Sequence, residues 1–81
     1  SMTGAGIFDG DMLVVDRALE PVPGKIIVAV IDGELTVKRL AFEDGRPVLK
    51  AQNPHFKDIV LRDSQELSCW GVVTSTIRKF D

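Results

Sequence analysis

The sequence has no tyrosine, and its 81 residues include only one cysteine, one histidine and one tryptophan. The single cysteine, Cys69, excludes an internal disulfide and a zinc site built on paired thiolates. This composition fits a reducing compartment, so we predict a cytoplasmic protein that uses no metal and no cofactor. The length allows one hydrophobic core, and we therefore predict a single domain over residues 1–81.

An excess of positive charge is also missing. Ten Lys and Arg residues stand against twelve Asp and Glu residues, which gives a net charge of -2. Nonspecific binding to a phosphate backbone needs a basic excess, so we do not expect direct nucleic-acid binding. The longest apolar run, Ile26–Ile31, is far shorter than the ~20 residues that cross a bilayer. We therefore expect neither a signal peptide nor a membrane anchor.

Long segments free of glycine and proline are few, which leaves little room for a long helix. The intervening segments are rich in Val, Ile, Leu and Thr, as strands are. Six strands are predicted, over residues 12–16, 25–31, 34–42, 47–52, 58–61 and 66–77. The fold class is therefore mostly β, an antiparallel β-rich domain with hairpins and no long helix.

Two dipeptides in this pattern are typical of tight hairpin turns. Asp32-Gly33 and Asp44-Gly45 each lie between apolar runs, and both residue types tolerate the positive φ angles that such turns need. Two consecutive hairpins form an antiparallel meander. Residues 21–24, with two prolines, are predicted to be a rigid connector, and Asn53-Pro54 is a similar loop signal.

The last predicted strand, residues 66–77, becomes continuously apolar around Gly71. Two interpretations stay open: a strand covered on both faces, as at a subunit contact, or a β-bulge at Gly71 within an ordinary core strand. Trp70 and Phe42 are predicted to fill the core. Cys69 is predicted to be a buried, unreactive thiol rather than a nucleophile.

Most polar residues give weak signals of chemistry. His55 lies in a proline-containing loop without a nearby nucleophile, so a Ser-His-Asp triad is disfavoured. Asp9, Asp11 and Asp16 flank a turn, and their spacing supplies too few oxygen ligands for a metal loop. Turn and capping roles are the stronger interpretation of these carboxylates.

A serine can instead be activated by a lysine, provided that the amine is neutral, which requires apolar surroundings. Lys38 fits best, because it lies within a predicted strand while the other lysines lie at strand ends or near polar loops. Alternation places Lys38 with Thr36 and Leu40, but does not decide whether this face or that of Val37 and Arg39 is buried. Only the lysine can lose its proton in a protein, and this favours burial of the Lys38 face.

Five segments in order carry a resemblance to a known family. They are Ser1-Met2, Asp9-Gly10-Asp11-Met12-Leu13-Val14-Val15-Asp16, Asp32-Gly33-Glu34-Leu35-Thr36-Val37-Lys38-Arg39-Leu40, Asn53-Pro54 and Trp70-Gly71-Val72-Val73. This order resembles the carboxy-terminal domain of the LexA/UmuD family of self-cleaving serine peptidases, most of all its UmuD branch. The resemblance implies that Ser1 is the nucleophile and Lys38 the general base, with Arg39 only a neighbour.

The resemblance also implies partners. Family members are cytoplasmic, form homodimers and cut their own amino-terminal arm when a RecA filament stimulates them. In the UmuD branch, the shortened product joins a translesion DNA polymerase subunit during SOS mutagenesis. In the family, a strand, the cleavage segment and a Gly-Asp or similar pair precede the Ser-Met, and we expect these to be absent from this chain. The catalytic residues are then present without the scissile bond.

Two alternatives remain, and a third is rejected. The same fold serves as the self-cleaving dimerisation domain of a LexA-like or phage-type transcriptional repressor. In a noncatalytic interaction module, Lys38 would be an ordinary strand cation. A signal peptidase shares the Ser/Lys chemistry but needs the membrane anchor that we do not expect here.

Overall fold

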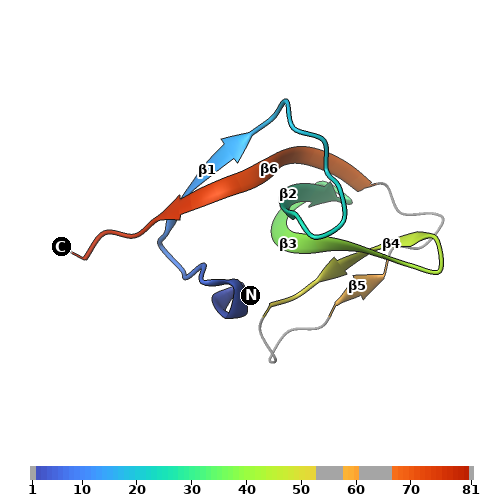
Figure 1. The fold of residues 1–81 in the computed structure, drawn as a ribbon, viewed down its shortest axis with the longest axis horizontal. Coiled ribbons are helices and arrows are strands. Elements are labelled where there is room, and N and C mark those ends of the chain that lie inside the picture. Colours follow the sequence, from blue (N-terminus) through green and yellow to red (C-terminus); the bar gives the residue numbers. More distant parts are fainter. Residues whose placement is uncertain (1, 53–57, 61–66, 81) are drawn as a thin grey trace.

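The computed structural model describes residues 2–52, 58–60 and 67–80. Within these residues a short 3-10 turn, η1 (Thr3–Ala5), precedes six strands. The strands are β1 (Met12–Asp16), β2 (Ile26–Ile31), β3 (Glu34–Glu43), β4 (Arg46–Lys50), β5 (Ile59–Val60) and β6 (Leu67–Ile77). They form one sheet in the order β1-β6-β2-β3-β4-β5, as the ribbon in Figure 1 shows. The described ranges contain no helix long and apolar enough to cross a membrane.

The middle of the sheet is the predicted meander. Strands β2, β3 and β4 pair antiparallel in sequence order, joined by two-residue turns. Both turns have positive φ angles at both residues: 49° and 85° at Asp32 and Gly33, and 52° and 76° at Asp44 and Gly45. These are the angles of the tight hairpins that match the right-handed twist of strands. The mostly β, antiparallel fold class is confirmed.

Strand β6 lies between β1 and β2 and pairs antiparallel with both. Its pairing with β2 passes from Gly71 opposite Val28 to Cys69 opposite Ala29, so Trp70 is an extra residue. A bulge therefore lies next to Gly71, as one of the two interpretations predicted. Gly71 itself is buried.

Two aromatic residues depart from prediction. Trp70 is 42% exposed and Phe42 is 51% exposed, so the prediction that they fill the core is wrong. Trp70 is the extra residue of the bulge, which takes its side chain out of the regular alternation. Phe42 stands near the end of β3, where the strand runs beyond the core.

The main hydrophobic core cluster lies on one face of the sheet. Its buried members are Ile27, Ala29, Leu40, Leu49 and Val72, which come from β2, β3, β4 and β6. Cys69 packs against this cluster, as its apolar context predicted, but it is only partly buried. This cluster thus joins four of the six strands of the described chain, and it lies on the face of the sheet that carries Lys38.

Candidate active site

Lys38 is the buried charged residue of the described chain, with 5% of its surface exposed. It lies directly opposite Ile27 on β2, and Ile27 lies opposite Val72 on β6. Directly paired residues place their side chains on the same face of a sheet. The Lys38 side chain therefore lies on the same face as Ile27 and Val72, which belong to the core. Leu40, two residues along β3, is 4% exposed. The prediction that the face of Lys38 and Leu40 is the buried one is confirmed.

The two basic residues of β3 lie on opposite faces of the sheet, because successive side chains of a strand alternate between its faces. The neighbouring Arg39 is only partly buried, and its guanidinium donates to the Gly24 carbonyl oxygen at 2.5 Å. The two basic residues therefore differ in their surroundings. The lysine faces the core, while the arginine links β3 to the connector before β2 through its hydrogen bond to Gly24.

The start of the chain docks at the end of β4. Gly4 N donates to the Gln52 carbonyl oxygen at 2.5 Å, and the Met2 carbonyl oxygen accepts from Ala5 N at 3.0 Å and Ile7 N at 3.1 Å. Met2 is 3% exposed. Gln52 follows β4, whose Lys50 pairs with Arg39, so η1 is fixed near the part of β3 that carries Lys38. Figure 1 shows η1 beside this end of the sheet.

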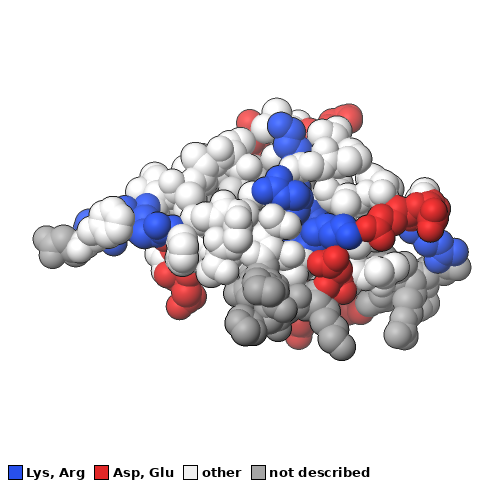
Figure 2. All heavy atoms as spheres, turned by 60° about the horizontal axis from the view of Figure 1, so that its bottom comes forward, with Lys and Arg blue, Asp and Glu red and all other residues white. Residues whose placement is uncertain are grey.

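Asp58 lies at the outer edge of β4. Its Oδ1 accepts a hydrogen bond from Ala51 N at 2.9 Å, and its Oδ2 lies 3.3 Å from Lys50 Nζ. Lys50 Nζ also contacts Glu43 Oε1 at 2.5 Å. On the face turned forward in Figure 2, basic and acidic side chains lie directly beside one another. The Ala51 amide, then Lys50 and Lys38, hold the pKa of Asp58 below its usual value, while Glu43 and Asp58 raise that of Lys50.

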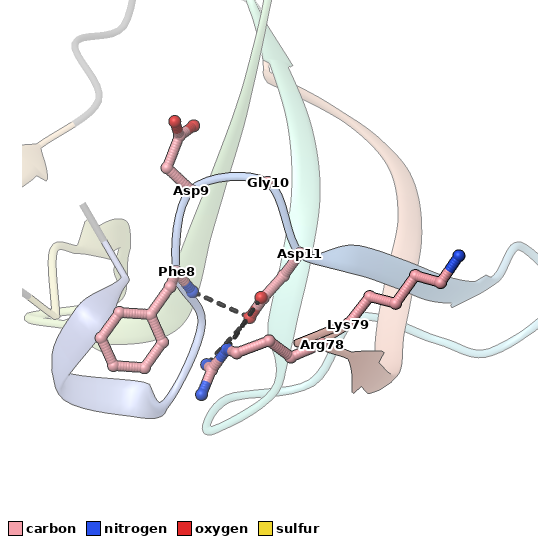
Figure 3. Close-up of a pocket in the computed structure, with 6 residues that line it drawn as sticks. All are labelled: Phe8, Asp9, Gly10, Asp11, Arg78 and Lys79. Atoms are coloured by element: carbon pink, nitrogen blue, oxygen red, sulfur yellow. Dashed lines mark hydrogen bonds and ion pairs between the residues drawn. The ribbon is translucent and has the colours of Figure 1, made fainter. Parts of the chain in front are cut away.

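A second polar cluster joins the turn before β1 to the end of β6 (Figure 3). Arg78 Nε lies 3.0 Å from Asp11 Oδ1, and its guanidinium carbon lies 4.0 Å from the centre of the Phe8 ring. Asp11 Oδ2 accepts from Phe8 N at 2.9 Å. The hydrogen bonds from Arg78 and from the Phe8 amide lower the pKa of Asp11, whose side chain is 2% exposed. Asp9 and Lys79 point away from this ion pair in Figure 3.

The predicted turn and capping roles of the acidic residues hold for two of them. Asp11 closes the turn before β1, and Asp16 Oδ1 accepts from Ala18 N at 2.8 Å just after that strand. The role of Arg78 was not predicted, because a basic residue after the last strand gives no local signal of a partner 67 positions away. Two predictions concern residues outside the described ranges. Ser1 is the predicted nucleophile, and His55 is predicted to have no catalytic role.

Residues 1–74, which include the buried Lys38 and the docked η1, match the family described as Peptidase S24-like. The chain belongs to the peptidase S24-like family. Its resemblance to the self-cleaving serine peptidases of the LexA/UmuD kind is thereby confirmed. Arg78 and the end of β6 lie beyond the matched residues of this peptidase S24-like domain.

Relatives of this peptidase S24-like chain carry the name LexA repressor. A LexA repressor of Cupriavidus taiwanensis is 45% identical over 78 residues, which cover 96% of this chain and 36% of the relative. That of Bordetella pertussis is 44% identical with the same coverage. That of Verrucomicrobium spinosum is 37% identical over 81 residues, which cover 39% of it. The chain thus spans little more than a third of these relatives, whose name favours the repressor alternative over the UmuD branch.

Proposed function

We propose that this domain is the self-cleaving, dimerising part of a LexA-like transcriptional repressor. The observation that carries the proposal is the similarity over 96% of the chain to proteins named LexA repressor. The chain spans little more than a third of those relatives. We therefore assign DNA recognition to the part of the whole protein that lies outside this domain. The acidic balance of this domain, with a net charge of -2, suits that division of labour.

The proposed chemistry is cleavage of a peptide bond upstream of Ser1. The neutral Lys38 amine takes the hydroxyl proton of Ser1 while Ser1 Oγ attacks the scissile carbonyl carbon. The resulting ammonium gives that proton to the leaving amine as the carbon–nitrogen bond breaks. A water molecule then attacks the ester, and the proton that it loses to Lys38 is returned to Ser1 Oγ. The burial of Lys38 beside Ile27 supports its role as the base.

The docking of the first turn supports the role of Ser1. Met2 is buried, and Gly4 is hydrogen-bonded to the strand end next to the part of β3 that carries Lys38. A nucleophile attached to an anchored turn would keep a constant relation to its base, which is the advantage that intramolecular positioning gives to a reaction. The approach of Ser1 Oγ to Lys38 Nζ within hydrogen-bond reach is part of the proposal.

The partners are proposed along with the reaction. We propose a cytoplasmic homodimer whose cleavage is stimulated by a RecA filament during the SOS response. The UmuD-like alternative, association of the processed protein with a translesion polymerase, is distinguished by the sequence before Ser1. A DNA-binding domain there fits the repressor, whereas a short arm with a cleavage pair fits the UmuD branch.

The reaction is tested in a longer chain that carries the segment before Ser1. Cleavage during alkaline incubation, followed by mass spectrometry of the products, should accelerate with rising pH, because the base must be neutral. Lys38→Arg keeps the charge but removes the neutral form, and Ser1→Ala removes the nucleophile, so both should abolish cleavage. His55→Ala is the control and should cleave at the parental rate. Cleavage of the Lys38→Arg chain at that rate, or loss of cleavage in the His55→Ala chain, would overturn the mechanism.

A further inference from the structure

Arg78 joins the residues after β6 to the turn at the start of the chain, and the proposed mechanism does not use it. Its Nη2 donates to the Gly6 carbonyl oxygen at 2.9 Å and to Asp11 Oδ2 at 3.1 Å, and its Nε donates to Asp11 Oδ1 at 3.0 Å. The guanidinium carbon lies 4.0 Å from the centre of the Phe8 ring (Figure 3). One planar group thus contacts the backbone of the first turn, a carboxylate and an aromatic ring.

Asp11 holds this guanidinium in one orientation. Its carboxylate also accepts from Phe8 N at 2.9 Å and from Thr76 Oγ1 at 3.2 Å, so it is itself fixed from both sides. A bidentate pair of arginine and carboxylate has a defined planar geometry. The second N–H of Arg78 Nη2 is therefore directed at the Gly6 carbonyl oxygen.

Gly6 ends the first turn of the chain. Gly6 N donates to the Thr3 carbonyl oxygen at 3.0 Å, and the φ angle of Gly6 is 85°. The next amide, Ile7 N, donates back to the Met2 carbonyl oxygen at 3.1 Å. The carbonyl group that Arg78 holds thus belongs to the same turn as Met2, which follows Ser1 directly in the chain.

Two attachments therefore hold this turn on the sheet. Gly4 N donates to the Gln52 carbonyl oxygen beyond the end of β4, and the Gly6 carbonyl oxygen accepts from Arg78 beyond the end of β6. A segment attached at one point can pivot about it, whereas attachment at two separate places fixes its orientation. The residues that match the peptidase S24-like family end at 74, so the match does not cover the second attachment.

We propose that Arg78 is a positioning residue for self-cleavage, which fixes the turn that carries Ser1 through the Gly6 carbonyl oxygen. This rests on the proposed function, in which Ser1 is the nucleophile. Reaction rates fall steeply when reacting groups are misplaced by as little as ~1 Å, so the second attachment matters for the rate even in a chain that folds without it. Arg78 acts through the turn and not on the reacting atoms.

The test is the rate of self-cleavage in the longer chain that includes the segment before Ser1, measured where circular dichroism shows each variant to be folded. Arg78→Ala removes the second attachment and should slow cleavage about tenfold or more. Free guanidinium ion should then raise the rate of Arg78→Ala by about threefold or more, because it can form the same charge-assisted hydrogen bonds to Asp11 and Gly6. Guanidinium lowers the stability of folded proteins, so a purely structural role predicts no such rise.

Lys79→Ala is the matched control, because it removes a positive charge from the next residue, whose side chain points away from the ion pair in Figure 3. It should cleave at the parental rate, with or without guanidinium. Three results would overturn the role of Arg78: a parental rate in Arg78→Ala, a slowed rate that guanidinium does not raise, or an equal loss in Lys79→Ala.

A second variant decides if Arg78→Ala fails to fold, since that change leaves the buried Asp11 carboxylate without its cation. Arg78→Lys keeps the charge but offers one nitrogen in place of the planar fork, so the folded variant should cleave about threefold or more slowly than the parent. Cleavage of folded Arg78→Lys at the parental rate overturns the inference.

Failure of the proposed function gives a different result. Parental cleavage by the Ser1→Ala or Lys38→Arg chain would remove the Ser-Lys chemistry, whatever the rate of Arg78→Ala. Loss of cleavage in both of those chains, combined with a parental rate in folded Arg78→Ala, overturns only the role of Arg78.

Discussion

Gly4 is the residue at which the first turn meets the sheet. Its amide donates to the Gln52 carbonyl oxygen, and a Cβ at this position would collide with that same oxygen. Gly4→Ala should therefore push η1 away from β4. If Ser1 is the nucleophile, its displacement should slow self-cleavage by about tenfold or more, since small misplacements of reacting groups are costly.

Thr3→Ala is the control for this prediction, because Thr3 is exposed and lies in the same turn. Cleavage rates of the two variants are compared in the longer chain, with unfolding midpoints as a check on the fold. Equal rates for Gly4→Ala and Thr3→Ala would show that docking of this turn does not position the nucleophile.

Asp11 should make the stability of the domain depend on pH. Its pKa in the folded chain is lowered from the usual 3.8, first by the hydrogen bond from Arg78 and then by the Phe8 amide. The unfolded chain therefore binds more protons in the acid range, so this contribution is present above about pH 5 and is lost as pH falls through the folded pKa. Urea unfolding at several pH values should show stability falling on acidification.

Asp11→Asn should weaken that dependence on pH, because the titrating group is gone. Asp9→Asn removes a neighbouring carboxylate that points away from Arg78, and should keep the parental dependence. An Asp11→Asn chain with the full parental loss of stability in acid would show that Asp11 does not carry this effect.

Single residues also show how far sequence reasoning reaches. Lys38 was assigned to the buried face because only a lysine can become neutral, and its 5% exposure agrees. Trp70 was assigned to the core from its size, and its 42% exposure disagrees. The alternation of a strand fixes which residues share a face only while the register is regular. The bulge beside Gly71 breaks that register at Trp70.

Among the elements, the strands agree closely with prediction while their order does not follow from it. Strand β3 was expected over residues 34–42 and spans Glu34–Glu43, because alternation and the Asp-Gly turns are local signals. The place of β6 between β1 and β2 rests on contacts between distant parts of the chain, which no local pattern encodes. The docking of η1 on Gln52 was not predicted for the same reason.

The close packing of β1 on β6 gives a prediction at this scale. A Cβ on Gly71 would collide with Val15 Cγ1 and lie 3.3 Å from Arg17 Cγ. Gly71→Ala should therefore cost about 1–3 kcal/mol of unfolding free energy by overpacking. Urea denaturation measures this loss.

A double-mutant cycle identifies the cause of the stability loss in Gly71→Ala. Val15→Ala removes the colliding methyl group, so Gly71→Ala in that background should cost clearly less than in the parent. Additive losses in the double variant would show that the collision with Val15 is not the origin of the effect.

At the scale of the whole molecule, one exposed apolar area lies where β1 meets the end of β6. Met12 pairs directly with Ile77, and they are 66% and 53% exposed. Val14, on the same face of β1 as Met12, is 43% exposed, and Phe80 beyond β6 is 91% exposed. A domain of this size has a limited core of its own, so pairing of two copies would add buried apolar surface.

The proposed homodimer should therefore depend on the end of β6. Sedimentation equilibrium at micromolar concentration should show a twofold dimer, and Ile77→Glu should raise its dissociation constant by at least about tenfold, because a charge would be buried at the interface. Phe42→Glu is the matched control: Phe42 is 51% exposed on β3, away from this area, and its charge should leave association unchanged. A parent that sediments strictly as a monomer would contradict dimerisation by this domain alone, whereas a dimer disrupted by Phe42→Glu rather than Ile77→Glu would move the interface to the β3–β4 side of the sheet.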